Sequence, residues 1–129
     1  MIQRMHMPLS VVKETRDVIN FLKDFKVLIQ EGRYVIKRHY KNRQTLTDLG
    51  ITEKLRVETL LALKANDYSS GPNSDEYGKA DYWIFGKEIS NVEIYIKLQI
   101  ITYSNGNEQA VCISFHTAEG SLIYPFKTV

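Results

Sequence analysis

Hydrophobic and polar residues alternate with a period of two in three stretches between residues 81 and 116. Such alternation is typical of strands in a sheet that has one buried face. In the middle stretch the apolar positions are Ile94, Ile96, Leu98 and Ile100, and the positions between them are Tyr95, Lys97 and Gln99. In the last stretch Val111, Ile113 and Phe115 share one face, and Cys112, Ser114 and His116 share the other.

The segment between the middle and last stretches is a strong turn signal, Ser104-Asn105-Gly106-Asn107, which predicts that the two strands are antiparallel neighbours. Tyr95, Lys97, Ser114 and His116 are then expected together on the face of the sheet that points away from the core. We call this face the open face and predict that it is the working surface of the protein.

The first third of the chain has helical spacing instead. Ser10 can cap the start of a helix, and Gly32 stands where a helix end is expected. Between them the spacing of the apolar residues makes one stripe, formed by Val11, Val18, Leu22, Phe25 and Ile29. We expect this helix to pack on the core.

The region between this helix and the three strands is less regular. We predict a weak strand over 33–39, a short helix over 44–49 that ends near Gly50, and another helix that is capped by Thr52 and stops by Asn66. The buried side of the second of these helices would consist of Leu55, Leu60, Leu61 and Leu63. A long polar loop is predicted over 67–79, and a turn with a short edge segment over 119–127.

Helices followed by strands favour an α+β fold. The N-terminal helix and two short helices would pack on a small antiparallel sheet. A chain of 129 residues is long enough for a core and is expected to form one domain, residues 1–129.

The charge of the chain is nearly balanced, with 17 basic and 15 acidic residues, and by itself does not indicate nucleic acid. One basic run contains no acidic residue and consists of Arg33, Lys37, Arg38, His39, Lys41 and Arg43. Such a run is most often a solvated surface, and the functional alternative is a strip that contacts phosphates. The single Cys112 excludes an internal disulfide and favours a reducing cytoplasm. Neither a membrane span nor a secretory signal is expected.

Several kinds of site are excluded by the motifs. There is no glycine-rich phosphate loop, no pair of cysteines and no nucleophile elbow of the Gly-x-Ser-x-Gly type. His6, His39 and His116 are too scattered to suggest a zinc site. We therefore expect neither a metal nor a cofactor.

The open face still permits metal-independent cleavage of RNA, in which the 2′-hydroxyl attacks the neighbouring phosphorus. His116 would act as general base or acid, Lys97 would stabilise the phosphate charge, and Tyr95 would donate a hydrogen bond or act as an acid if its pKa falls. Lys87 and Arg38 would assist. Aromatic faces for a splayed base are offered by Trp83, Tyr68 and Tyr77. The predicted RNA-binding set is Lys87, Trp83, Arg38, Lys37, Lys41 and Tyr68.

Each of these residues also has a plainer interpretation. His116 and Lys97 can be ordinary surface residues, and Tyr95 can simply pack against its cross-strand neighbours. Trp83 is more often part of a core than a stacking platform. Cys112 is expected to be a small buried residue without reactivity.

Five short motifs carry a resemblance to a known family: Leu46-Thr47-Asp48-Leu49-Gly50-Ile51-Thr52, Asp67-Tyr68-Ser69-Ser70-Gly71-Pro72, Trp83-Ile84-Phe85-Gly86-Lys87, Ile94-Tyr95-Ile96-Lys97-Leu98 and Cys112-Ile113-Ser114-Phe115-His116. They resemble the MqsR-like toxin family of bacterial type II toxin–antitoxin systems. The resemblance covers most of the chain from about residue 33 and is weaker over the N-terminal helix.

The resemblance implies a fold like that of the RelE-type ribonucleases and an mRNA interferase that needs no metal. It also implies a cytoplasmic protein that a co-expressed antitoxin neutralises, with a toxin–antitoxin hetero-oligomer as a possible assembly. The family's active-site positions fall here on Tyr95 and His116. This sequence departs from the founding member, which has Lys in place of His116, a further Lys where Ser69 and Ser70 stand, and Gln in place of Ile84.

The sequence therefore predicts the toxin of a type II toxin–antitoxin system that is an endoribonuclease acting on mRNA. The alternative is a non-catalytic module that binds RNA or protein through the same open face.

Overall fold

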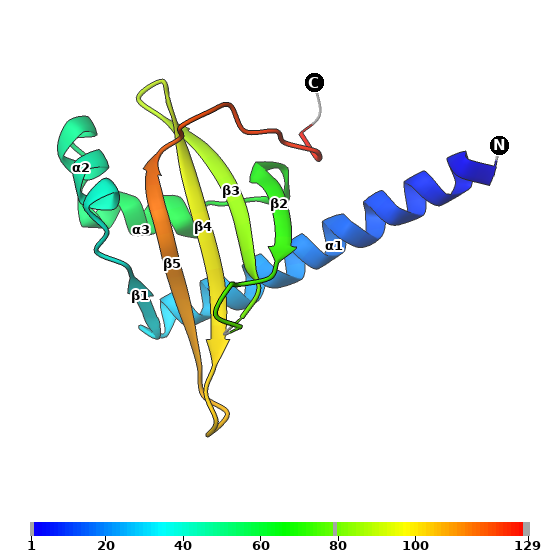
Figure 1. Ribbon diagram of the computed structural model, residues 1–129, viewed down its shortest axis with the longest axis horizontal. Helices are drawn as coiled ribbons and strands as arrows, with labels where there is room; N and C mark the ends of the chain where they lie inside the picture. The colour runs from blue at the N-terminus through cyan, green and yellow to red at the C-terminus, as the bar shows by residue number, and fades with distance from the viewer. Residues whose placement is uncertain (1, 79, 128–129) are drawn as a thin grey trace.

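The computed structural model describes residues 2–78 and 80–127, with side chains from residue 15 onward. In this part of the chain a five-stranded sheet packs against three α-helices, so the predicted α+β class is confirmed. Helix α1 (Ile2–Gln30) and helix α3 (Glu53–Leu61) lie behind the sheet in Figure 1, and helix α2 (Tyr40–Leu49) lies beside it.

The sheet contains β1 (Tyr34–Ile36), β2 (Tyr68–Asn73), β3 (Tyr82–Ile89), β4 (Val92–Thr102) and β5 (Glu108–Thr117). Their order across the sheet is β1-β5-β4-β3-β2. Strands β2 to β5 are antiparallel to their neighbours, and the predicted antiparallel pairing of β4 with β5 is confirmed. Strand β1 runs parallel to β5 and makes the sheet a mixed one. The prediction of an antiparallel sheet is therefore wrong at this edge.

Helix α1 supplies one wall of the core. Val18, Leu22, Phe25 and Ile29 are buried, as the stripe predicts. The helix ends where expected, since Gly32 adopts a φ of 76° and the Arg33 amide donates to the Leu28 carbonyl at 2.8 Å.

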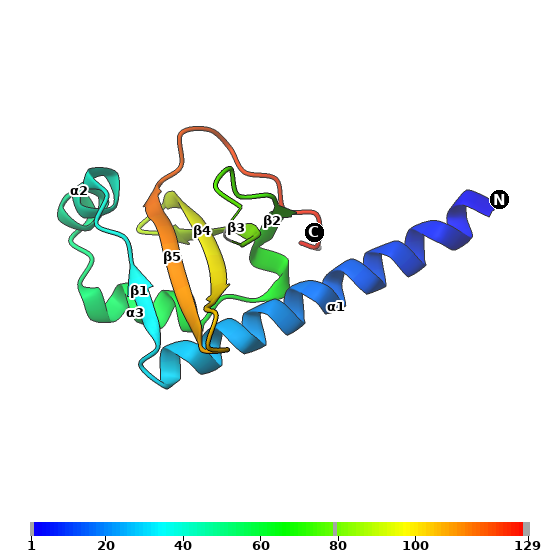
Figure 2. The same cartoon turned by 60° about the horizontal axis from the view of Figure 1, so that its bottom comes forward.

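The start of α1 differs from the prediction. It begins at Ile2 rather than at Ser10, and its first turns extend beyond the sheet (Figure 2). The side chains of Ser10 and Val11 lie outside the described residues, so their predicted roles stay predictions.

The two short helices both form, with corrected bounds. Helix α2 starts at Tyr40, before the predicted Gln44, and ends at Gly50 with a φ of 64°. Thr52 caps α3 as predicted, because its hydroxyl oxygen accepts the Leu55 amide at 3.1 Å. Leu60 and Leu63 are buried, whereas Leu55 is exposed.

Two other predictions of secondary structure are corrected. Strand β1 has only three residues, since the chain leaves the sheet after Ile36 to start α2. The predicted loop over 67–79 instead contains β2, which pairs with β3 at the far edge of the sheet. Its polar composition is compatible with an edge strand, because one side of such a strand meets water.

Strand β5 contains a β-bulge that the alternation did not predict. Lys97 of β4 pairs with Ser114, whereas the next residue, Leu98, pairs with Cys112, so Ile113 is one extra residue in β5. The bulge shifts the alternation by one position: Phe115 and Cys112 both face the helices, and Val111 lies on the open face. The prediction that Val111 and Ile113 share the face of Phe115 is therefore wrong, as is the placement of Cys112 on the open face.

Candidate active site

Tyr95 and His116 meet at the centre of the candidate site. They are directly opposite each other on the antiparallel strands β4 and β5. Their rings stack with centroids 5.3 Å apart and planes inclined by 22°. Both side chains are partly buried on the open face. The predicted juxtaposition of these two residues is therefore present, and it follows from the register of two long paired strands.

The hydrogen bond of the His116 ring defines what the ring can do. Its Nδ1 lies 2.9 Å from the carbonyl oxygen of Thr117. A carbonyl oxygen only accepts, so Nδ1 carries the hydrogen and Nε2 keeps a lone pair in the neutral ring. The imidazole is thus held in the tautomer that can take a proton at Nε2.

The environment of Tyr95 makes it a hydrogen-bond donor. Burial raises the pKa of the Tyr95 phenol, and the neighbouring Tyr82 and Glu119 act in the same direction. Tyr95 was expected to act as an acid only if its pKa falls, and that condition is not met. The phenol keeps its proton and can donate a hydrogen bond to an anionic oxygen.

Lys97 shares the open face but does not point at the imidazole. It pairs with Ser114, two residue pairs along the ladder from Tyr95 and His116. Its Nζ lies over the ring of Tyr82 on β3, 4.1 Å from the ring centroid. Tyr82, which was not among the predicted site residues, therefore holds the ammonium group beside the site. A lysine side chain has enough rotatable bonds to turn from there toward a bound anion.

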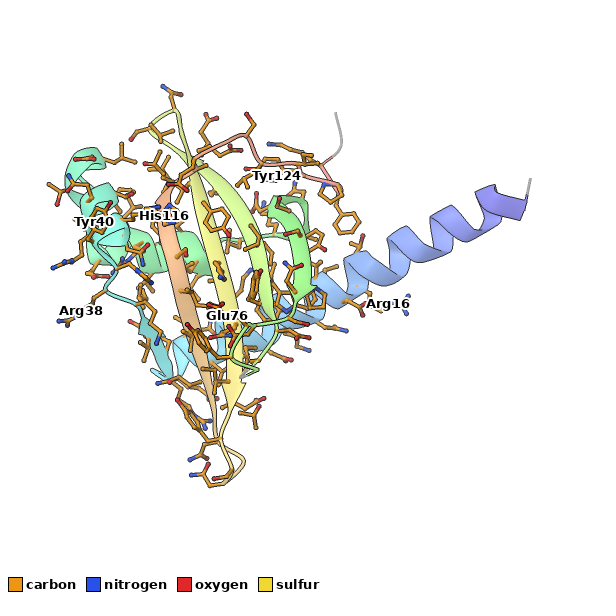
Figure 3. The ribbon with its side chains drawn as sticks, in the orientation of Figure 1. Arg16, Arg38, Tyr40, Glu76, His116 and Tyr124 are labelled. Carbon is orange, nitrogen blue, oxygen red and sulfur yellow. The ribbon has the colours of Figure 1, made fainter. Side chains whose placement is uncertain are left out.

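A hollow of about 300 Å³ adjoins His116 on its other side, between α2 and the end of β5. Its wall includes Tyr40, Lys41, Gln44, Asp48, His116 and Glu119. Figure 3 labels Tyr40 and His116, which lie at the same end of the molecule. Only Lys41 and His116 of this group were predicted as site residues, because the helix was expected to begin at Gln44 and the residues around Tyr40 were not placed on it.

One cation of the predicted RNA-binding set lies in this region, and it is already paired. Lys41 Nζ lies 2.7 Å from Glu119 Oε2. The hydrogen bond and the charge of Lys41 lower the pKa of the Glu119 carboxyl, and the same contact raises the pKa of Lys41. Lys41 therefore lies near His116 as an ion pair rather than as a free cation.

The other predicted RNA-binding residues lie elsewhere. Trp83 stacks on Phe21 of α1, with ring centroids 4.7 Å apart, so it belongs to the core on the helix side of the sheet. Tyr68 packs against Trp83 and lies 5.2 Å from Phe126 by ring centroids. The alternative expectation, that Trp83 is part of the core rather than a stacking platform, fits this position. Neither the Trp83 ring nor the Tyr68 ring faces Tyr95.

The remaining predicted cations are also separated from the Tyr95–His116 pair. Lys87 pairs with Ile94, so it faces the helix side, and its Nζ lies 3.3 Å from Asp67 Oδ2. Lys37 and Arg38 are exposed between β1 and α2, and neither forms an ion pair with the residues that the structure describes. Only Tyr95, His116, Lys97 and Lys41 of the predicted set therefore gather in one region.

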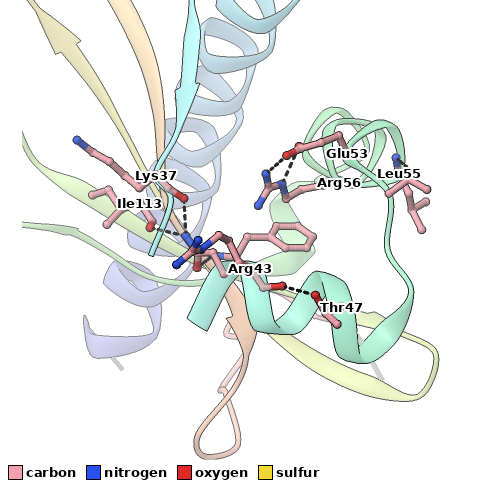
Figure 4. A network of polar contacts seen from close by, with 10 residues as sticks. Lys37, Arg43, Thr47, Glu53, Leu55, Arg56 and Ile113 are labelled. Atoms are coloured by element: carbon pink, nitrogen blue, oxygen red, sulfur yellow. Dashed lines mark hydrogen bonds and ion pairs between the residues drawn. The ribbon is translucent and has the colours of Figure 1, made fainter. Parts of the chain in front are cut away.

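Asn42 holds β5 in position behind the site. Its side chain is fully buried and makes three hydrogen bonds to backbone groups. The amide nitrogen donates to the carbonyl oxygens of Lys37 at 3.0 Å and Ile113 at 3.1 Å, and the amide oxygen accepts the Phe115 N–H at 2.9 Å. Figure 4 shows the contacts with Lys37 and Ile113. Asn42 thereby satisfies the Ile113 carbonyl at the bulge and the amide of Phe115, the residue before His116.

The C-terminal tail borders the site on the side of β3. Gly86, opposite Tyr95 in the sheet, has no room for a Cβ, which would lie 2.1 Å from the Tyr124 hydroxyl oxygen. That hydroxyl donates to Glu93 Oε2 at 2.6 Å, and the Leu122 amide donates to Glu93 Oε1 at 3.2 Å. The predicted edge segment is therefore an irregular tail that crosses the open face.

Comparisons with known proteins return no relative: no family model matches the chain, and no curated protein or solved structure matches it significantly. Among the described residues, no helix has the length and apolarity needed to cross a membrane. The same residues contain no group of three or more histidine, cysteine, aspartate or glutamate side chains that could hold a metal ion.

Proposed function

We propose that this protein is a metal-independent endoribonuclease and the toxin of a type II toxin–antitoxin system. The observation that carries the proposal is the stacked Tyr95–His116 pair, in which the imidazole Nε2 has a free lone pair and the phenol keeps its proton. The resemblance of the strand motifs to the MqsR-like family supports the toxin part, and cytoplasmic mRNA is the proposed substrate.

In the proposed mechanism His116 Nε2 takes the proton of a 2′-hydroxyl, and the resulting oxyanion attacks the adjacent phosphorus. Charge that builds on the non-bridging oxygens is stabilised by the Tyr95 hydroxyl and by Lys97, which turns from the ring of Tyr82. The bond to the 5′ oxygen breaks, and that oxygen takes a proton from water. The hydroxide that is left takes the proton held on His116 Nε2, so the base is regenerated and a 2′,3′-cyclic phosphate remains.

Cleavage of a defined single-stranded RNA in the presence of a chelator tests the proposal. His116→Ala is expected to lower the rate by about 10²- to 10⁴-fold, the usual contribution of general acid–base catalysis. Tyr95→Phe, which removes only the hydroxyl, is expected to give a smaller loss. His39→Ala is the matched control, because His39 is exposed and its side chain makes no capping hydrogen bond.

Full activity in His116→Ala would refute the assignment of the base. RNA binding without cleavage at any protein concentration would instead favour the non-catalytic module, and that binding should weaken steeply with salt. A small gene beside this one, encoding a protein with a helix-turn-helix pattern, would support the antitoxin partner.

A further inference from the structure

An aromatic ring to which the proposed mechanism gives no role of its own lies on the open face. Tyr82 is in β3, where the pleat turns Trp83 toward the helices and Tyr82 to the opposite side of the sheet. Burial is the main cause that raises the pKa of the Tyr95 phenol, and the nearby Tyr82 phenol is the second. Tyr82 therefore shares its surface with the groups that would hold the scissile phosphate.

One face of the Tyr82 ring is covered by a cation. Lys97 Nζ lies 4.1 Å from the ring centroid, and the ion pairs of the described residues do not include Lys97. An ammonium group gains more from a phosphate oxygen than from an aromatic ring, because the phosphate carries a full negative charge. A bound phosphate is therefore expected to draw the ammonium off the ring.

A nucleobase is suited to take the place of the ammonium on the ring. Every base has a flat π-face that stacks on an aromatic side chain, and in RNA the ribose joins this base to the phosphate. The surroundings of the ring offer few groups that could read a base. Ile84, which pairs with Lys97, is apolar and buried, and the buried Gln99 opposite Tyr82 donates its amide to the Ala80 carbonyl at 3.2 Å. Selection by stacking, which favours the larger ring system of a purine, follows from these surroundings.

We propose that Tyr82 is the platform for a nucleobase beside the scissile phosphate, and that Lys97 leaves this ring when it binds the phosphate. The identity of the ligand as RNA rests on the proposed function. Tyr82 thereby takes the stacking role predicted for Trp83 and Tyr68, whose rings pack on the helix side of the sheet. The two contacts are coupled, because the base stacks only after the ammonium has moved to the phosphate.

Proton NMR follows the exchange, because protons above an aromatic ring are shielded. The Hε protons of Lys97 are expected at higher field than those of the exposed lysines. The probe is the dinucleotide of 2′-O-methyladenosine, which attack by a 2′-hydroxyl cannot cleave. It should move the Lys97 Hε signal downfield, as the ammonium leaves the ring, and the Tyr82 ring signals upfield, as the base stacks. Inorganic phosphate should move only the Lys97 signal, and adenosine should move neither.

Variants of Tyr82 test the platform. Tyr82→Leu removes the ring and is expected to weaken the dinucleotide at least about fivefold, whereas Tyr82→Phe keeps the ring and should bind it within about twofold of the wild type. Tyr103→Leu is the matched control, since Tyr103 is exposed in the connection between β4 and β5, and it should change nothing. Replacing adenine by uracil should weaken binding to the wild type but not to Tyr82→Leu, a difference that a purely structural role of Tyr82 would not produce.

The outcomes separate this proposal from the proposed function. Equal binding by Tyr82→Leu and the wild type, or Tyr82 ring signals that do not move with the dinucleotide, would overturn the proposal. If RNA is not cleaved but the dinucleotide moves both signals, the nucleobase site stands and the nuclease assignment falls. If RNA is cleaved and Tyr82→Leu has the kcat and KM of the wild type, the nuclease assignment stands and the nucleobase site falls.

Discussion

Replacing Asn42 tests how the fold supports the candidate site. Asn42→Ala would leave the carbonyl oxygens of Lys37 and Ile113 and the amide of Phe115 without their partner in a buried region. A buried polar group that loses its hydrogen bond costs about 1–3 kcal/mol. With the lower figure for each of the three groups, the free energy of unfolding should fall by about 3 kcal/mol, and the lost side-chain volume adds to this.

A loss of this size is a large share of the stability of a typical domain, about 5–15 kcal/mol. Urea unfolding followed by tryptophan fluorescence measures it, because the single tryptophan, Trp83, stacks on Phe21 in the core. Asn66→Ala is the matched control, since Asn66 is exposed, and its effect should stay within about 0.5 kcal/mol.

A second substitution separates the hydrogen bonds from the cavity. Asn42→Asp keeps the side-chain size and the acceptor for Phe115 but turns a carboxylate oxygen toward the carbonyl oxygens of Lys37 and Ile113. Burial and these neighbours favour the protonated acid in the folded state, so its stability should rise as the pH falls and be lost as the pH rises. An Asn42→Ala variant as stable as Asn66→Ala would refute the role assigned to these three bonds.

Further predictions concern the tail, the thiol and a helix cap. Gly86→Val should displace the tail from the open face, seen as faster hydrogen exchange over 118–127, because a Cβ would meet Tyr124. Burial raises the pKa of the Cys112 thiol to about 12 from 9.0, so the thiol should resist alkylation in the folded protein. As the pH rises, the thiol of the unfolded chain loses its proton at a lower pH than the buried thiol does. The free energy of unfolding should therefore decline between about pH 9 and 12, and this decline should be less steep in Cys112→Ala. Thr52→Ala should cost about 1 kcal/mol in urea unfolding.

The sequence predicts those parts of the fold in which one local rule decides the outcome. The stripe on α1, the glycine that ends it and the cap at Thr52 each depend on spacing or on one hydrogen bond within a few residues. Strand β2 was missed because an edge strand needs little apolar sequence and is defined by its partner β3. The parallel pairing of β1 was missed for the same reason, since it depends on contacts between distant segments.

The residues of the candidate site could likewise be predicted only in part. Tyr95, Lys97 and His116 could be placed on one face because β4 alternates cleanly and a turn signal pairs it with β5. The position of Tyr82 under Lys97 could not be predicted, because the register of β3 against β4 is not visible in the sequence of either strand. Lys87 and Trp83 were assigned to the RNA surface from residue type alone, and the pleat of β3 turns both toward the helices.

The bulge in β5 joins the core to the candidate site. Phe115 and Cys112 both face the helices only because Ile113 is an extra residue between them. With regular alternation, a strand that buried Cys112 would turn Phe115 outward and His116 inward. The inserted residue therefore allows the C-terminal half of β5 to bury Phe115 and to place His116 beside Tyr95 at the same time. Asn42 then satisfies the carbonyl that the bulge leaves unpaired, so the position of the proposed base depends on a buried amide on α2.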